Sequence, residues 1–416
     1  MRGGTRYLRR SLVRAANTAN AVRAFDRFGY ASPLSFMAGW LTSELPLHTI
    51  AVQAIGTVRA ARRGDLRSPA GALGLAIDVA SWSQLYGIHR RAMQAGRVFD
   101  EALATELGTD WESHVAESWR PTERPLRASR LAQPFELARR TKCRHKNVSY
   151  GPAGRRNLLD VFQPDGIAPG AKAPVLLQVH GGGWIIGNKE EQGQPLMAHL
   201  CEQGWVCVAI NYSLSPKAKW PAHIVDVKRA IAWVKEHIAE YGGDPDFIVI
   251  TGGSAGGHLS SLAALTANDP AYQPGFESAD TTVQACVPFY GVFDFTNRDG
   301  NARRDMQSIL ERHVFPTRLD DDRETWDLAS TMSRVHPDAP PFFVIHGTND
   351  ALAPVEQART FVDLLRKDSQ APVVYAELPG AQHAYEIFWS PRTHATVLAV
   401  ARFVAFVRSE HERVGR

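Results

Sequence analysis

Ser254 is the side chain in this sequence best suited to act as a nucleophile. It follows the apolar stretch Phe247–Ile250 and precedes a helix-like segment, His258–Leu265. Gly252 and Gly256 flank it in a G-x-S-x-G pattern, which is typical of a serine held on a sharp turn between a strand and a helix. Side chains at both glycine positions would collide with neighbouring backbone in so tight a turn. We therefore predict a serine hydroxyl poised to attack an acyl carbonyl.

A glycine-rich loop upstream of the serine could stabilise the charge that such an attack creates. This loop reads H-G-G-G-W and closes the apolar strand Pro174–Val179. Its glycines let backbone N–H groups approach a bound carbonyl and face the negative oxygen of a tetrahedral intermediate. A plain strand-to-loop turn does not require three successive glycines. The motif residues are His180, Gly181, Gly182, Gly183 and Trp184.

Two loops further along the chain supply a candidate acid and a candidate base. Asp350 follows the strand Phe342–Ile345, and His383 follows the strand Val373–Leu378. Serine, aspartate and histidine then occur in an order known for catalytic triads. The alternatives are an Asx turn or helix N-cap for the aspartate and a solvated loop position for the histidine. We predict that both residues are partners of Ser254.

Together these three side chains could perform acyl transfer. His383 would take the proton of Ser254 as its oxygen attacks, and would later return that proton to the leaving group. Asp350 would fix the imidazole tautomer and stabilise its charged form.

Alternating strands and helices must position these groups. Predicted strands lie near residues 158–163, 174–179, 205–211, 247–252, 283–289, 342–347 and 373–378, and predicted helices near 190–203, 221–241, 255–267, 355–367 and 393–409. This alternation predicts a mostly parallel, doubly wound α/β sheet with the site at the carboxyl ends of its strands. The segment 293–341 interrupts the rhythm and predicts a helical insertion. Its acidic run, Asp320–Asp322, is interpreted as a solvated turn and not as a metal site.

Over residues 157–406 the chain resembles the hormone-sensitive-lipase-like bacterial esterases of the α/β-hydrolase superfamily. The shared features are the H-G-G-G loop, the S-A-G-G sequence at Ser254, and the stretch Asn211–Pro216 leading to Trp220–Ala222, with Asp226 at the position of a following acidic residue. The resemblance implies an α/β-hydrolase fold and a carboxylic-ester hydrolase without a cofactor. It also implies an oxyanion hole formed by the N–H groups of Gly182, Gly183 and Ala255.

The sequence departs from this family in two places. Gly253 stands where the family usually has an aspartate before the nucleophile. The segment Asp350–Val355 is closer to the H-G-G-x-W acylhydrolases, which include kynurenine formamidase-like amidases, and Trp184 and His258 fit that group too. Trp184 is therefore a candidate substrate-binding residue. The long amino-terminal extension also looks like that of actinobacterial ester hydrolases assigned to lipid metabolism.

The first 145 residues differ in charge from the rest of the chain. They hold 22 Lys and Arg residues against 12 Asp and Glu residues, although the whole chain has a formal net charge of only +4. We predict a helical, basic extension over residues 1–145 and a catalytic domain over residues 146–416. No nucleic-acid-binding motif accompanies the arginines, so we expect no nucleic-acid partner.

Three interpretations of this extension remain open. Its most apolar stretches, Phe36–Val58 and Ala70–Ile88, are interrupted by charged residues and are followed by arginine clusters. The helices could cap the catalytic domain and shape an acyl pocket, lie on an anionic membrane surface, or span a membrane. The start of the chain lacks a clear secretory signal. We expect a cytoplasmic or peripherally membrane-associated protein of unknown oligomeric state.

The sequence therefore favours a serine esterase or lipase-like enzyme acting on short- to medium-chain acyl esters. The alternatives with the same triad are an aryl-formamidase or amidase and an esterase of acylated sugars or envelope components. A catalytically silent binding protein of the same fold is the alternative from another class. We expect no cofactor and no metal, and Cys207, in an apolar run, is expected to be a buried thiol.

Overall fold

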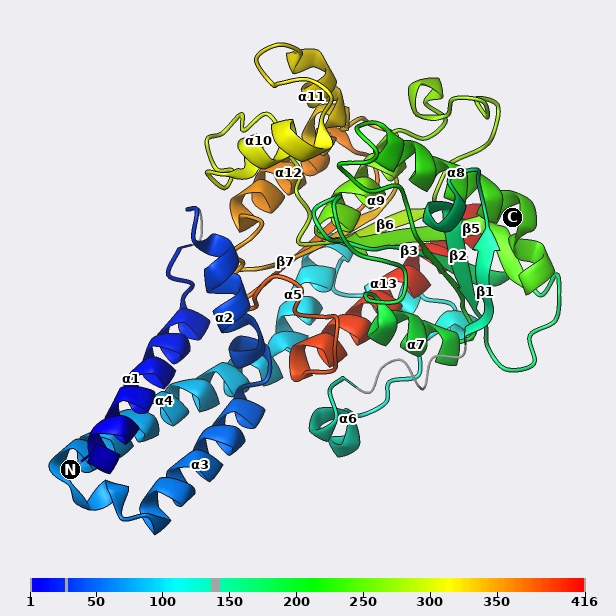
Figure 1. Ribbon diagram of the computed structural model, residues 1–416. Helices are drawn as coiled ribbons and strands as arrows, with labels where there is room; N and C mark the ends of the chain where they lie inside the picture. Colours follow the sequence, from blue (N-terminus) through cyan, green and yellow to red (C-terminus); the bar gives the residue numbers. More distant parts are fainter. Residues whose placement is uncertain (1, 27–28, 136–142, 415–416) are drawn as a thin grey trace.

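A single, mostly parallel sheet organises the catalytic part of the chain. The computed structural model describes residues 2–26, 29–135 and 143–414 (Figure 1). Within these residues, eight strands form one sheet in the order β1-β2-β4-β3-β5-β6-β7-β8. The strands are β1 (Cys143–Ser149), β2 (Leu158–Phe162), β3 (Ala173–Val179), β4 (Val206–Ile210), β5 (Gly243–Gly253), β6 (Ala285–Phe289), β7 (Phe342–Gly347) and β8 (Val373–Leu378). Strands β1 and β2 pair antiparallel, and β4, β3, β5, β6, β7 and β8 pair parallel, which confirms the predicted fold class.

Two layers of helices cover the sheet (Figure 1). One layer contains α5 (Ala95–Leu107), α7 (Gln194–Glu202) and α13 (Pro391–Val414), and the other contains α8 (Ala222–His237), α9 (Ala255–Leu265) and α12 (Val355–Asp368). Side chains alternate between the layers along each strand. In β4, for example, Val208 packs in the cluster with α8, whereas Cys207 packs in the cluster with α13. Burial on both faces explains the near-continuous apolar runs in the sequence.

The sequence did not predict strand β1. Its residues are exposed along most of the strand, and it lies at the edge of the sheet. Polar and charged residues on an edge strand hinder pairing with other molecules. They also remove the apolar alternation by which a half-buried strand is recognised in a sequence.

Four amino-terminal helices extend away from the sheet (Figure 1). They are α1 (Arg2–Val22), α2 (Ser32–Glu44), α3 (Pro46–Arg62) and α4 (Pro69–Met93), and we call them the front helices. Helix α5 follows them but packs against the sheet, because Phe99 and Leu103 are buried in the same apolar cluster as β8 and α13. Since residues 136–142 lie outside the described residues, the boundary near residue 145 stays a prediction.

Short helices occupy the predicted insertion between β6 and β7. They are α10 (Met306–Ile309), a π-helix (Leu310–Val314), α11 (Arg323–Ala329) and a 3₁₀ turn (Thr331–Arg334). Another short helix, α6 (Ala128–Ala132), lies before the sheet in the sequence. The acidic run forms a turn in which Asp322 caps α11 by accepting from the Thr325 N–H at 3.2 Å. Among the helices of the described residues, none has the length and apolar character needed to cross a bilayer.

Candidate active site

Ser254 lies at the turn between β5 and α9, as the sequence predicts. Its backbone has φ +58° and ψ −121°, in a region that non-glycine residues rarely adopt. A Cβ atom on Gly252 would lie 2.5 Å from the Val179 carbonyl oxygen, and one on Gly256 would collide with the same atom. Glycine is therefore required on both sides of the serine. The Ser254 N–H donates to the Phe289 carbonyl at 3.0 Å, which fixes the turn against β6.

The glycine-rich loop lies beside this turn. A Cβ atom on Gly181 would come within 3.2 Å of the Ser254 Cβ. Gly182 and Gly183 have φ of +116° and +60°, so both use backbone conformations that favour glycine. The Gly181 N–H donates to the Gln192 side chain at 2.7 Å, whereas the N–H groups of the next two glycines have no acceptor among the described residues. These free donors could stabilise an oxyanion.

The first N–H of helix α9 belongs to Ala255, the residue after the serine. An N–H group at this position has no partner within its own helix. The partial positive charge of a helix amino terminus also favours a developing negative charge there. The structure thus brings the third predicted oxyanion donor to the same corner as Ser254.

His180 and Trp184 hold the two ends of the glycine-rich loop. The buried His180 ring stacks on Tyr212, with ring centroids 4.3 Å apart, and its Nδ1 lies 2.7 Å from the Gly181 carbonyl. The Trp184 side chain is also buried, and its indole N–H donates to His258 Nδ1 at 3.3 Å. Burial lowers the pKa of His180 and of His258 to about 4, so both rings are neutral near pH 7. A role for Trp184 in substrate binding stays a prediction.

The predicted acid and base are in direct contact. His383 Nδ1 lies 2.7 Å from Asp350 Oδ2, and both side chains are buried. The other carboxylate oxygen accepts the N–H groups of Leu352 and Ala353 at 2.7 and 2.8 Å. Burial alone would raise the pKa of Asp350, but the charge of His383 and hydrogen bonds from His346 and His383 hold that pKa well below its usual range. A permanently ionised Asp350 suits the orientation of an imidazole.

His346 is a neighbour of the acid that the sequence analysis did not single out. It is the penultimate residue of β7, four residues before Asp350, and its Nε2 lies 3.3 Å from Asp350 Oδ2 and 2.9 Å from the Ala353 carbonyl. The imidazole thus supports the loop that presents the carboxylate to His383. A histidine at the end of a strand, just before the acid, was the available signal.

Tyr290 and Glu386 form a second support that sequence reasoning missed. The Tyr290 ring lies 4.5 Å from the His383 ring, centroid to centroid, and its hydroxyl donates to the buried Glu386 carboxylate. Burial raises the pKa of Glu386 to about 7. A Cβ atom at Gly253 would lie 2.6 Å from the Tyr290 oxygen. Glycine in place of the usual aspartate therefore makes room for Tyr290, and that departure was the signal in the sequence.

Ser254 and His383, the predicted nucleophile and base, are not hydrogen-bonded to each other in this geometry. Among the side-chain hydrogen bonds of the described residues, none joins Ser254 to His383. Such bonds are often long in unliganded enzymes and tighten when the substrate binds. In the part of the chain that the structure describes, no group of three or more metal-binding side chains gathers.

Comparison with known proteins identifies relatives along almost the whole chain. The family described as BD-FAE matches residues 159–365. The probable carboxylic ester hydrolase LipM of Mycobacterium tuberculosis is 48% identical over 403 residues, which cover 95% of this chain and 91% of LipM. Esterase LipQ of the same organism is 43% identical over 414 residues, which cover 98% of this chain and 93% of LipQ.

A solved structure shares the fold of the catalytic part. A truncated form of a carbohydrate esterase from gut microbiota has a TM-score of 0.55 at 24% identity, covering 65% of this chain and 99% of its own. These relatives and this architecture confirm the resemblance found in the sequence: the chain belongs to the hormone-sensitive-lipase-like esterases of the α/β-hydrolase superfamily and is a carboxylic ester hydrolase.

Proposed function

We propose that this esterase uses Ser254, His383 and Asp350 as a catalytic triad. The observation that carries the proposal is the hydrogen bond between His383 Nδ1 and Asp350 Oδ2, at 2.7 Å. This bond leaves Nε2 of the imidazole as the basic nitrogen, because the ionised carboxylate requires the proton on Nδ1. The Ser254 turn and the glycine-rich loop then supply a nucleophile and donors on one side of the site.

The reaction proceeds in two halves. His383 accepts the hydroxyl proton of Ser254 while the serine oxygen bonds to the ester carbonyl carbon, and the carbonyl oxygen becomes negative. The N–H groups of Gly182, Gly183 and Ala255 stabilise that oxygen. His383 then protonates the departing alcohol and leaves an acyl-enzyme. Water, deprotonated by His383, attacks this intermediate and releases the acid and the free serine.

Aromatic side chains near His383 favour a moderately lipophilic acyl group. Phe36 of α2 meets the His383 ring edge-on, with centroids 6.0 Å apart, and stacks on Trp40 at 5.3 Å. Phe388 lies 5.5 Å from Trp40 and 5.1 Å from Phe135. Such a group of rings binds alkyl chains through buried area. We therefore propose short- to medium-chain acyl esters as substrates.

A series of p-nitrophenyl esters with acyl chains of about two to sixteen carbons tests this proposal. We expect an optimum at short to medium chain lengths, together with covalent labelling of Ser254 by a fluorophosphonate, located by peptide mass spectrometry. Labelling at another residue would overturn the triad. If the p-nitrophenyl esters are not hydrolysed but N-formylkynurenine or acetylated sugars are, the substrate belongs to the formamide or carbohydrate-ester class instead.

The packing of the front helices supports a peripheral contact with an anionic lipid surface. Helix α2 buries small or polar residues and exposes apolar ones: the buried residues are Ser32, Ser35, Gly39, Thr42, Ser43 and Glu44, and the exposed ones include Leu34, Met37 and Leu41. Helix α3 exposes Leu47, Val52, Ile55 and Val58 and ends in exposed arginines. Apolar faces next to arginines are typical of helices that lie in the interface of anionic membranes.

Sedimentation of the full chain with vesicles tests this contact. We expect binding to vesicles that contain phosphatidylglycerol, and at least about tenfold weaker binding after the double substitution Val52→Asp and Val58→Asp. The matched control is Leu328→Asp, an exposed apolar position on α11. A wild-type chain that does not bind, or a control that weakens binding equally, would overturn the membrane contact.

A further inference from the structure

Helix α2 contacts the chain on both sides of His383. The Trp40 indole N–H donates to the carbonyl of Ala384 at 3.0 Å. Four residues later, one carboxylate oxygen of Glu44 accepts the backbone N–H of Gln382 at 3.1 Å. One turn of the same helix thus binds the residue before the histidine and the residue after it.

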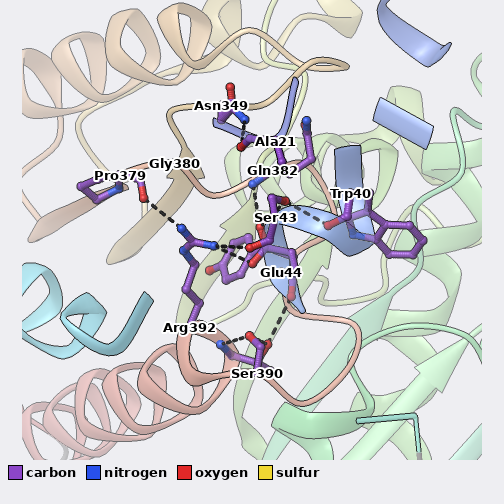
Figure 2. A network of polar contacts seen from close by, with 12 residues as sticks. Ala21, Trp40, Ser43, Glu44, Asn349, Pro379, Gly380, Gln382, Ser390 and Arg392 are labelled. Atoms are coloured by element: carbon purple, nitrogen blue, oxygen red, sulfur yellow. Dashed lines mark hydrogen bonds and ion pairs between the residues drawn. The ribbon is translucent and has the colours of Figure 1, made fainter. Parts of the chain in front are cut away.

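Glu44 is held in place by a buried ion pair. Its second carboxylate oxygen lies 2.9 Å from Arg392 Nη1, and the two side chains are 0% and 2% exposed. Arg392, near the start of α13, also donates to the carbonyl of Pro379 at 3.2 Å, at the beginning of the His383 loop (Figure 2). Burying two charges is costly unless both find partners. This pair is fully partnered and joins α2, the His383 loop and α13.

The side chain of Gln382 binds the backbone of both the Asp350 loop and the His383 loop. Its side-chain oxygen accepts the N–H of Ala351, next to the acid, at 2.8 Å, and the N–H of His383 at 2.9 Å. The side chain therefore links the loop of Asp350 to the loop of the histidine. Since Glu44 fixes the backbone of Gln382, α2 sets the position from which that link is made.

A second contact ties the front helices to the loop of the acid. The Asn349 side chain accepts the N–H of Ala24 at 2.8 Å and donates to the carbonyl of Ala21 at 3.0 Å (Figure 2). Asn349 directly precedes Asp350. The end of α1 and the end of α2 thus bind one catalytic loop each.

We propose that Glu44, paired with Arg392, is a positioning residue for His383, so that the catalytic imidazole is correctly placed only when α2 is docked. This inference rests on the triad proposed above. Acyl transfer depends steeply on the geometry of the base, and a displacement of about 1 Å far from the chemistry can cost about a hundredfold in rate. The residue touches no reacting atom. It acts through the backbone of Gln382.

Steady-state kinetics of Glu44→Ala and Glu44→Gln test the proposal on the full chain. Alanine removes the acceptor for the Gln382 N–H, and we expect kcat to fall about ten- to a hundredfold with KM changed by less than about threefold. Glutamine keeps an oxygen acceptor at this position. It should restore kcat to within about threefold of the wild type.

The matched control is Asp78→Asn, which disrupts another buried ion pair of the front helices. Asp78 lies 2.7 Å from Arg14 and is fully buried, but its hydrogen bonds stay within the front helices. We expect this variant to lower the melting temperature and to keep kcat within about twofold at a temperature where it is folded. Loss of kcat equal to that of Glu44→Ala would assign the effect to general instability and overturn the proposal.

Two further variants distinguish a failure of the positioning role from a failure of the proposed triad. If Glu44→Ala does not fold, Trp40→Phe removes the hydrogen bond to Ala384 while keeping an aromatic ring beside Phe36, and kcat should fall about three- to tenfold. Ser254→Ala is measured alongside. An inactive Ser254→Ala with wild-type kcat in the Glu44 and Trp40 variants would overturn the positioning role alone. An active Ser254→Ala would overturn the triad itself.

Discussion

The sheet and the front helices differ in the size and polarity of the side chains that they bury. The clusters on the two faces of the sheet are almost entirely aliphatic and aromatic. In α2, α3 and α4 most buried positions hold small or polar residues, with Leu85 and Ile88 of α4 as exceptions, while large apolar residues such as Met37, Val52 and Leu73 are exposed. In water the first pattern stabilises a fold through the hydrophobic effect. The second resembles helix packing in lipid, where small residues allow close approach and polar side chains bind across helices. The difference supports the lipid contact that we propose for the front helices.

The two regions meet at the catalytic loops. The face of α2 turned toward His383 carries Phe36, Trp40 and Glu44, while other large apolar residues of this helix are exposed. The buried polar residues of α2 are therefore not a defect of packing. They include Glu44, which binds the loop of His383.

The largest difference between the regions is expected in their effect on kcat, and substitution of one buried aspartate in each region measures this difference. Asp350→Asn removes the charge that orients His383, and we expect kcat to fall about 10³- to 10⁴-fold with p-nitrophenyl butyrate. Asp78→Asn, in the front helices, should leave kcat within about twofold. Equal losses in the two variants, measured on folded protein, would contradict the division of roles.

The second difference is expected in the response to acid. The catalytic part buries four histidines whose pKa values are lowered, first of all by burial: His180, His199 and His258 to about 4 and His223 to about 3. The unfolded chain binds protons at these sites below its pKa of about 6.5, and the folded chain does not. Their contribution to stability is therefore present above about pH 6.5 and is lost as the pH falls toward 4.

Urea unfolding at pH 7 and pH 5 checks this expectation. The free energy of unfolding should fall by about 1–2 kcal/mol for each of these histidines. His145→Gln, at an exposed position on β1, is the control for substitution of a histidine alone. A free energy of unfolding that is the same at both pH values would show that these rings are not neutral in the folded protein.

The third difference is expected in the response to side-chain truncation. Leu177→Ala, at a fully buried position in β3, should cost about 2–5 kcal/mol of unfolding free energy. Val52→Ala, at a position 70% exposed in α3, should change stability by less than about 0.5 kcal/mol. Calorimetry of both variants in water provides the comparison. A large loss from Val52→Ala would mean that this face is covered in solution.

The catalytic part could largely be predicted from the sequence because its signals are local. A few consecutive residues are enough to recognise each apolar strand, the glycines around Ser254 and the H-G-G-G loop. The positions of Asp350 and His383 follow from strand ends, and the structure places the two in contact. Strand β1 was missed because an exposed edge strand carries no apolar pattern.

The supports of the site could not be predicted in the same way. Glu44 and Gln382 are 338 positions apart in sequence, and their contact depends on how α2 docks. A glutamate at a helix end is usually solvated, so nothing local distinguishes Glu44 from an exposed residue. The only sequence signal for Tyr290 was the unusual Gly253 beside Ser254. Long-range contacts of this kind become visible only in the folded chain.

The most direct test of the central claim is the kcat/KM of Ser254→Ala for p-nitrophenyl butyrate, measured on protein whose circular dichroism matches the wild type. Our account predicts a loss of at least about 10⁴-fold, because the nucleophile of the acyl-enzyme is gone while the oxyanion donors remain. A variant that keeps more than about a tenth of wild-type activity would contradict hydrolysis through Ser254.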